Sequence, residues 1–100
     1  MYDMKNVKKF EKMRELAPKP FAAFAAFDAA AFEGGTIPLK YKELMAVAVA
    51  LTTQCPYCIE IHAKKAKKAG AVEQELAETT LVAAALRAGG AMTHGTHALE

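Results

Sequence analysis

Several features that would indicate other kinds of protein are missing from this sequence of 100 residues. It has no tryptophan, and residues that favour β-strands are few, with only five valines and three isoleucines. It also lacks the run of about 18 apolar residues that a membrane-spanning helix needs, and its N-terminal residues do not resemble a signal peptide. We therefore expect a cytoplasmic protein without a membrane-bound segment and with few or no strands.

An excess of charge of one sign is also absent, because 13 lysines and arginines oppose 11 acidic residues. The net charge of +2 is too small to indicate a nucleic-acid-binding protein by itself. Lysines gather near the end of an expected helix at 56–69, where they complement the negative end of the helix dipole. Such faces are usually solvated, so we expect no nucleic-acid partner.

Alanine is the most abundant residue and accounts for 22 of the 53 hydrophobic positions. Because alanine is the strongest helix former, the sequence predicts an all-α fold, and its length allows one domain over 1–100. Alanine side chains bury little area each, so a lone protomer would be only marginally stable. We therefore expect a homo-oligomer in which copies of the chain cover one another's apolar surface.

The spacing of apolar residues, prolines and glycines predicts five to six helices. Gly70 is expected to cap the fourth helix, and Gly89 and Gly90 are expected to end the fifth. The expected helices cover 6–17, 21–32, 38–52, 56–69 and 72–88, and 91–99 forms a sixth short helix or a tail.

Two of these helices should supply most of the buried apolar surface. The centre of the third, 44–51, is apolar on every side and is expected in the middle of the core. The second carries Phe21, Phe24 and Phe27 on an alanine background, which is typical of a core or of a subunit interface. A partner-binding scaffold built on these phenylalanines is a less favoured alternative.

Both cysteines fall in one Cys-Pro-Tyr-Cys motif, Cys55 to Cys58. In a reducing compartment such a pair indicates a redox site or half of a metal site rather than a structural disulfide. Pro56 suits the first position of a helix, which would make Cys55 its N-cap. Both sulfurs would then lie near exposed backbone N–H groups, and both thiolates should be favoured.

Two further residues complete a candidate catalytic group. His62 follows Cys58 by four residues, one helical turn along the same face, where it can accept or return the thiol proton. A short turn at Thr53 and Gln54 should make the helices before and after it antiparallel, which brings Glu43 level with His62 at about 1.5 Å per residue. A Glu43, His62, Cys58 proton relay follows, although Glu43 could instead pair with a surface lysine such as Lys40 or Lys42.

These residues and their spacing resemble the active-site signature of the alkylhydroperoxidase D-like group of the carboxymuconolactone decarboxylase family. The matching pattern is Glu43, twelve positions to Cys55, the motif Cys-Pro-Tyr-Cys, and His62 four residues after Cys58. The resemblance covers residues 10 to 95 approximately. It implies a small helical fold that assembles as trimers or hexamers, and a thiol-dependent peroxidase without metal, haem or flavin.

The resemblance also implies a role for each residue. Cys58 would attack the peroxide and become a sulfenic acid, Cys55 would resolve it as a disulfide, and Glu43 with His62 would move protons. A lipoylated or thioredoxin-like dithiol protein would then reduce the disulfide. Some members have a second histidine inside the motif where this chain has Tyr57, which weakens the expectation of efficient peroxidase activity.

Other functions stay open at this point. Cys55, as the N-cap, should be the more exposed sulfur, so the site could instead be a disulfide reductase or a redox sensor. Zinc held by the two cysteines, His62 and Glu43 is a structural alternative. His94 and His97 have the wrong spacing for a zinc finger and are expected to be polar residues near a subunit contact. Decarboxylation is the remotest option, because it needs no cysteine pair.

Overall fold

A computed structural model describes residues 2–100, and all the regular structure in this range is helical. The expected all-α class with five main helices is therefore confirmed. In chain order the elements are η1 (Met4–Lys9), α1 (Phe10–Leu16), α2 (Pro18–Phe32), α3 (Leu39–Thr53), α4 (Pro56–Lys68), α5 (Glu73–Gly95) and η2 (Thr96–Ala98).

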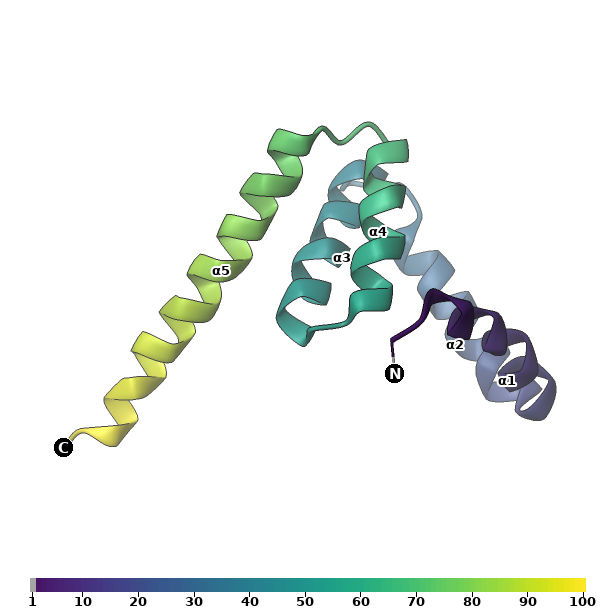
Figure 1. Cartoon of the computed structure of the whole chain (residues 1–100), viewed down its shortest axis with the longest axis horizontal. Helices are drawn as coiled ribbons and strands as arrows, with labels where there is room; N and C mark the ends of the chain where they lie inside the picture. Colours follow the sequence, from purple (N-terminus) through teal and green to yellow (C-terminus); the bar gives the residue numbers. More distant parts are fainter. Residues whose placement is uncertain (1) are drawn as a thin grey trace.

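The centre of the fold is an antiparallel pair formed by α3 and α4, which lie side by side in Figure 1. The connection is short because Gln54 ends α3 in the left-handed conformation, with φ of 58°, and Cys55 begins α4 as its N-cap. A left-handed residue after a helix reverses the chain within one or two positions. The antiparallel arrangement expected from the turn at Thr53 and Gln54 is therefore confirmed.

The N-terminal part of the chain forms a second pair, η1 with α1 against α2, at one end of the molecule (Figure 1). The helix expected over 6–17 is divided: η1 is a 3₁₀ helix that begins at Met4, and α1 continues it from Phe10. Asp3 caps η1 by accepting a hydrogen bond from the Lys5 N–H at 2.9 Å. The prolines of α2 lie in its first turn, where the missing N–H is harmless.

The last long helix, α5, leaves the central pair and extends away from it to the C-terminal end (Figure 1). The prediction that Gly89 and Gly90 end this helix is wrong, since α5 continues to Gly95. Each glycine costs about 1 kcal/mol relative to alanine, and strong helix formers on both sides outweigh that cost. Within residues 2–100 no helix, α5 included, is both long and apolar enough to cross a bilayer.

The buried core is small and consists mainly of alanine. Its apolar members are Leu44, Val47, Ala50, Ala66, Ala71 and Ala83. Only one face of α3 is buried, because Met45 is 50% exposed and Val49 is 59% exposed. The expectation that the whole of 44–51 lies inside the core is therefore wrong for the chain by itself, since α4 and α5 do not surround α3.

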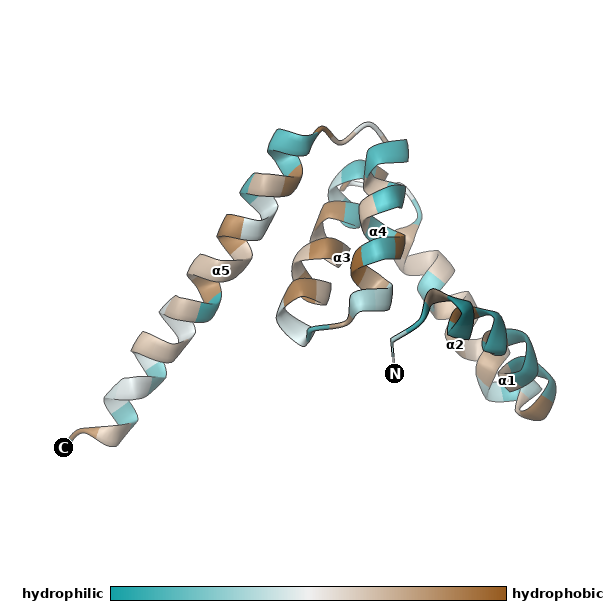
Figure 2. Cartoon of the chain, viewed as in Figure 1, coloured by the Kyte–Doolittle hydropathy of each residue, from teal (hydrophilic) through white to brown (hydrophobic). Residues whose placement is uncertain are grey.

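Two of the phenylalanines of α2 are exposed to solvent rather than buried in a core. Phe21 packs near Phe10 of α1, with ring centroids 6.1 Å apart, but Phe24 is 64% exposed and Phe27 is 70% exposed. The core interpretation is therefore wrong for Phe24 and Phe27. Figure 2 shows hydrophobic residues along α5 as well, on a helix that has solvent on most of its surface.

These exposed faces give the chain an open shape. Its radius of gyration is 16.6 Å, whereas a compact domain of this length has about 13 Å. Its accessible surface of 7852 Å² likewise exceeds the roughly 5,500 Å² typical of a folded monomer of this mass. The chain alone therefore leaves much apolar surface in contact with water.

Candidate active site

The two cysteines lie at the start of α4, immediately after the turn that reverses the chain. Cys55 is the N-cap, as expected, and its sulfur accepts a hydrogen bond from the Cys58 backbone N–H at 3.3 Å. Both cysteines are free thiols and both are partly exposed. A reactant can therefore reach either sulfur, and the two are close enough to interact.

The structure makes the two thiols unequal. Hydrogen bonds from the Cys58 thiol and from the Cys58 backbone N–H lower the pKa of Cys55. The same thiol–thiol hydrogen bond, together with burial, raises the pKa of Cys58 to about 11. The expectation of two favoured thiolates is thus correct for Cys55 and wrong for Cys58, because the hydrogen bond between the thiols favours the thiolate of Cys55 and disfavours that of Cys58.

This inequality predicts a clear order of alkylation. At neutral pH, iodoacetamide should label Cys55 first, since the thiolate is the nucleophile and only the pKa of Cys55 is lowered. Cys58 should become reactive as the pH approaches 11. In Cys55→Ser, the pKa of Cys58 should fall, because the thiol that raises this pKa is lost. Peptide mass spectrometry after short pulses at several pH values would check this, and equal labelling at neutral pH would contradict it.

Glu43 and His62 form the second half of the site. Glu43 lies on the buried face of α3 and is only 4% exposed, yet its Oε1 is 2.6 Å from His62 Nδ1 on α4. Lys40 pairs with Glu75 instead, at 3.0 Å, and the Lys42 ammonium binds backbone carbonyls. The predicted pairing of Glu43 with His62 is therefore confirmed, and the alternative of a surface lysine as its partner is wrong.

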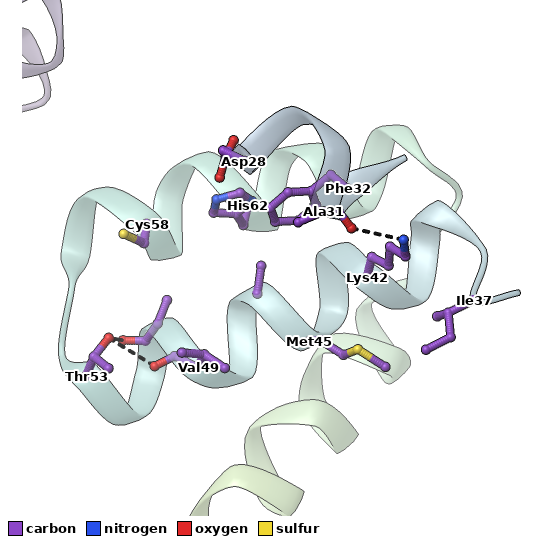
Figure 3. A pocket seen from close by; sticks show the side chains of 12 residues that line it. Asp28, Ala31, Phe32, Ile37, Lys42, Met45, Val49, Thr53, Cys58 and His62 are labelled. Atoms are coloured by element: carbon purple, nitrogen blue, oxygen red, sulfur yellow. Dashed lines mark hydrogen bonds between the residues drawn. The ribbon is translucent and has the colours of Figure 1, made fainter. Parts of the chain in front are cut away.

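A further contact to the imidazole was not predictable from the sequence. The ring of Phe32, at the end of α2, stacks on the His62 ring with centroids 5.2 Å apart and planes 10° from parallel. Figure 3 shows this ring beside His62, with Cys58 nearer the start of the helix that carries His62. Phe32 and Glu43 together fix the orientation of the imidazole: Phe32 packs against the face of the ring, and Glu43 is hydrogen-bonded to its Nδ1 atom. A phenylalanine in an apolar stripe carries no sequence signal for this role.

Lys42 holds Phe32 in place through the backbone of α2. Its Nζ donates to the carbonyl oxygen of Ala31 at 2.9 Å and to that of Glu33 at 2.5 Å. These are carbonyls at the C-terminal end of α2, where a cation is favourable (Figure 3). Lys42, the residue before Glu43 in the sequence, thus joins α2 to α3 directly next to the ring that stacks on His62.

Replacing this lysine should loosen the attachment of α2. We expect Lys42→Met to lower the free energy of unfolding by about 1–2 kcal/mol, because two charge-assisted hydrogen bonds to carbonyls are lost. Urea denaturation would measure the shift in midpoint. Lys12→Met on the exposed face of α1 is the matched control and should change the midpoint little; an equal shift in both variants would contradict the role of Lys42.

Two hollows include Cys58 and His62 in their linings. The first, which we call the α2–α3 cleft, is about 470 Å³ and contains Cys58 but not Cys55. Figure 3 shows Asp28 of α2 beside His62 at the edge of this cleft, a position that sequence reasoning did not identify. The remaining lining is mostly apolar and comes from Ala31, Phe32, Ile37, Met45, Ala46, Val49 and Ala50, with Lys42 and Thr53.

The structure does not assemble the metal site considered as an alternative. Within residues 2–100, no three or more histidine, cysteine, aspartate or glutamate side chains gather in a way that could hold a metal ion. The four candidate residues instead form two pairs, one of thiols and one of Glu43 with His62. His94 and His97 are exposed near the end of α5, with ring centroids 5.5 Å apart, so they take no part in the site.

Comparisons with known proteins agree with this arrangement. An uncharacterized protein of the cox locus of Paracoccus denitrificans is 46% identical over 77 residues, covering 77% of this chain and 69% of its own length. An uncharacterized protein of Haemophilus influenzae is 46% identical over 93 residues, covering 93% and 82%. Neither relative brings an assigned activity with it.

Solved structures show the same fold. A protein from Methanobacterium thermoautotrophicum superposes with a TM-score of 0.82 at 34% identity, covering 88% of this chain and 99% of that one. A carboxymuconolactone decarboxylase family protein from Legionella pneumophila, in its apo form, gives 0.78 at 33% identity, covering 82% and 73%. The sequence pattern of that family also matches residues 18–100. On these grounds the chain belongs to the carboxymuconolactone decarboxylase family.

Proposed function

We propose that the protein is a thiol-dependent peroxidase, of the alkylhydroperoxidase D-like kind, that reduces organic hydroperoxides. The observation that carries the proposal is the buried Glu43–His62 pair, at 2.6 Å, one helical turn from Cys58 of a free dithiol. A carboxylate and an imidazole beside a thiol are the parts needed to move a proton while sulfur attacks.

The unequal thiols make this proton relay necessary. With a pKa of about 11, Cys58 is protonated at neutral pH, and a thiol is a poor nucleophile. Because the Glu43 carboxylate is hydrogen-bonded to Nδ1 of His62, Nε2 is the nitrogen that can take the Cys58 proton. Glu43 orients the ring for this transfer and stabilises the imidazolium that forms.

The first chemical step consumes the peroxide. The Cys58 sulfur attacks the terminal peroxide oxygen, an S–O bond forms and the O–O bond breaks. His62 accepts the thiol proton and passes it to the alkoxide that leaves as an alcohol. Cys58 is oxidised to a sulfenic acid, and the peroxide is reduced by two electrons.

The second step uses Cys55. The Cys55 sulfur, whose pKa is lowered, attacks the Cys58 sulfenic sulfur, an S–S bond forms, and hydroxide leaves as water with the proton that Cys55 gave up. A dithiol donor, such as a lipoylated or thioredoxin-like protein, would then reduce the disulfide by exchange. The N-cap position of Cys55 makes its sulfur the one that such a donor meets first.

The direct test mixes the reduced, metal-free protein with cumene hydroperoxide and follows peroxide loss, free thiols and protein mass. A peroxidase should lose both thiols and two hydrogen atoms in mass for each peroxide consumed in the first turnover. Thiols that stay free while the protein is exposed to peroxide would contradict the proposal.

One observation favours a second candidate, a dithiol–disulfide oxidoreductase. The lowered pKa of the accessible Cys55 is typical of the attacking cysteine in such enzymes. In that case the thiols would ignore peroxide but oxidise readily with a protein disulfide. Decarboxylation, the activity in the family's name, does not use a cysteine pair and is not favoured by this site.

We further propose that copies of the chain assemble, as trimers or hexamers. The excess accessible surface of roughly 2,300 Å² over a compact monomer is comparable to what one protomer buries in an extensive interface. The exposed apolar residues of α2, α3 and α5 are available for it, including Phe27, Val49 and Leu86. Sedimentation analysis should detect an oligomer at micromolar concentration, and a stable folded monomer would contradict this.

A further inference from the structure

The tyrosine inside the cysteine motif is attached to the beginning of the chain. The Tyr57 hydroxyl accepts hydrogen bonds from the Asn6 side-chain amide at 3.0 Å and from the Asp3 backbone N–H at 3.3 Å. The Tyr2 ring meets the Tyr57 ring edge-on, with centroids 4.8 Å apart. The Tyr2 hydroxyl also donates to Glu60 of α4 at 3.4 Å. Residues 2–9 therefore contact α4 at Tyr57, between the two cysteines in sequence, and at Glu60.

Residues 2–9 lie outside the range 18–100 that matches the family. Tyr57 also stands where some members of the resembling group have a histidine. Tyr57, which replaces that histidine, is thus the residue that binds residues 2–9, which lie outside the range that matches the family.

Behind this contact is the second hollow, which we call the N-terminal hollow. It is about 530 Å³, within the usual range for a small-molecule site. Its apolar walls come from four elements, through Val7 of η1, Phe10 of α1, Phe24 of α2 and Ile61 of α4. Cys55, Cys58 and His62 also line it, so an occupant would lie directly against the reactive groups.

The charges around the N-terminal hollow indicate the chemistry of an occupant. Lys65 and Asp28 are the charged residues of its lining besides the site's own groups, and they have opposite signs. The hollow therefore offers no net attraction for an anion or a cation. Its aromatic and aliphatic walls instead suit an uncharged hydrocarbon group.

We propose that residues 2–9, held on Tyr57, are a specificity element that completes a binding site for the uncharged organic group of the hydroperoxide. The proposal rests on the proposed peroxidase function. The hydrocarbon group would lie against Val7, Phe10, Phe24 and Ile61, with the peroxide oxygens toward Cys58 and His62. Hydrogen peroxide has no such group, so the segment should favour organic hydroperoxides over it.

The test compares two substrates in the full chain. For each variant, stopped-flow kinetics would give the ratio of kcat/KM for cumene hydroperoxide to kcat/KM for hydrogen peroxide. We expect this ratio to fall about tenfold in Tyr57→Phe, which loses the acceptor for Asp3 and Asn6 but keeps the ring. Asn6→Ala should lower it in the same direction without any change in α4.

Matched controls are available on the same helices. Phe24→Ala should lower the ratio, whereas Leu16→Ala, on α1 and outside the N-terminal hollow, should not. Tyr41→Phe on α3 is the control for loss of a tyrosine hydroxyl and should also leave the ratio unchanged. Far-ultraviolet circular dichroism would verify that each variant is folded.

The outcomes separate the two proposals. If the wild-type protein consumes both peroxides but the ratio is the same in Tyr57→Phe, Asn6→Ala and Phe24→Ala, the specificity element is refuted and the peroxidase stands. If the wild-type protein consumes neither, the peroxidase fails. The N-terminal hollow is then tested by NMR titration with 2-phenyl-2-propanol, the alcohol product: shifts at Val7 and Ile61 support a hydrocarbon site, and their absence overturns it.

Discussion

Replacing Cys58 by serine is expected to abolish peroxide consumption. The serine hydroxyl is a far weaker nucleophile than a thiol, and the other cysteine, Cys55, does not line the α2–α3 cleft with His62. Because Cys58 is also a source of the hydrogen bond that lowers the pKa of Cys55, the remaining thiol should become less reactive as well. Peroxide loss measured under multiple turnover, with an excess of a chemical dithiol, would show the effect.

Cys55→Ser is the matched comparison, and its expected result differs in kind. The first peroxide should still be reduced, because Cys58 and His62 remain. The reaction should then stop at a Cys58 sulfenic acid, which a dimedone adduct would reveal by mass. Normal turnover in Cys58→Ser together with loss of the first turnover in Cys55→Ser would reverse the assigned roles and make Cys55 the attacking residue.

The second large effect is expected at Glu43. Glu43→Gln keeps the size of the side chain and a hydrogen bond to His62, but it cannot stabilise an imidazolium. We expect the rate of the first turnover to fall about 10²- to 10⁴-fold, the usual contribution of a positioned acid–base group. Glu43→Ala should be slower still, since the imidazole also loses its orientation at Nδ1.

The controls for this series lie on exposed parts of α5. Glu78→Gln removes one carboxylate outside the site, and His94→Ala removes one imidazole; neither should alter the first turnover. His62→Ala should match or exceed the loss in Glu43→Ala. Full activity in Glu43→Gln would show that the carboxylate is only structural, because the amide retains the same space and the hydrogen bond.

The site was largely predictable because its residues belong to one local segment. The number of residues between Glu43 and the turn, and between the turn and His62, decides whether the two side chains meet, and helix geometry supplies the distances. Pro56 likewise indicates the helix start and makes Cys55 the N-cap. The pairing of Glu43 with His62 is confirmed at 2.6 Å, whereas the roles of the four residues in catalysis remain predictions.

What the sequence could not predict depends on contacts between distant segments. Phe32 and Lys42 act on the imidazole through the docking of α2 against α3, which no local pattern encodes. The inequality of the thiols depends on which sulfur donates to the other, and this requires coordinates. Gly89 and Gly90 are common helix-ending residues, but a helix ends only when another conformation is better for the chain there.

The short connection at Gln54 has a consequence for the order of folding. Glu43 and His62 are only 19 positions apart, and the left-handed residue between their helices closes a helical hairpin. Contacts over such short separations lose little loop-closure entropy and form early, whereas the docking of residues 2–9 on Tyr57 closes a loop of more than 50 positions. We expect the Glu43–His62 contact to be native-like in the folding transition state and residues 2–9 to dock on Tyr57 afterwards. Reactive chemistry and substrate choice would thus reside in two cooperative units of different stability.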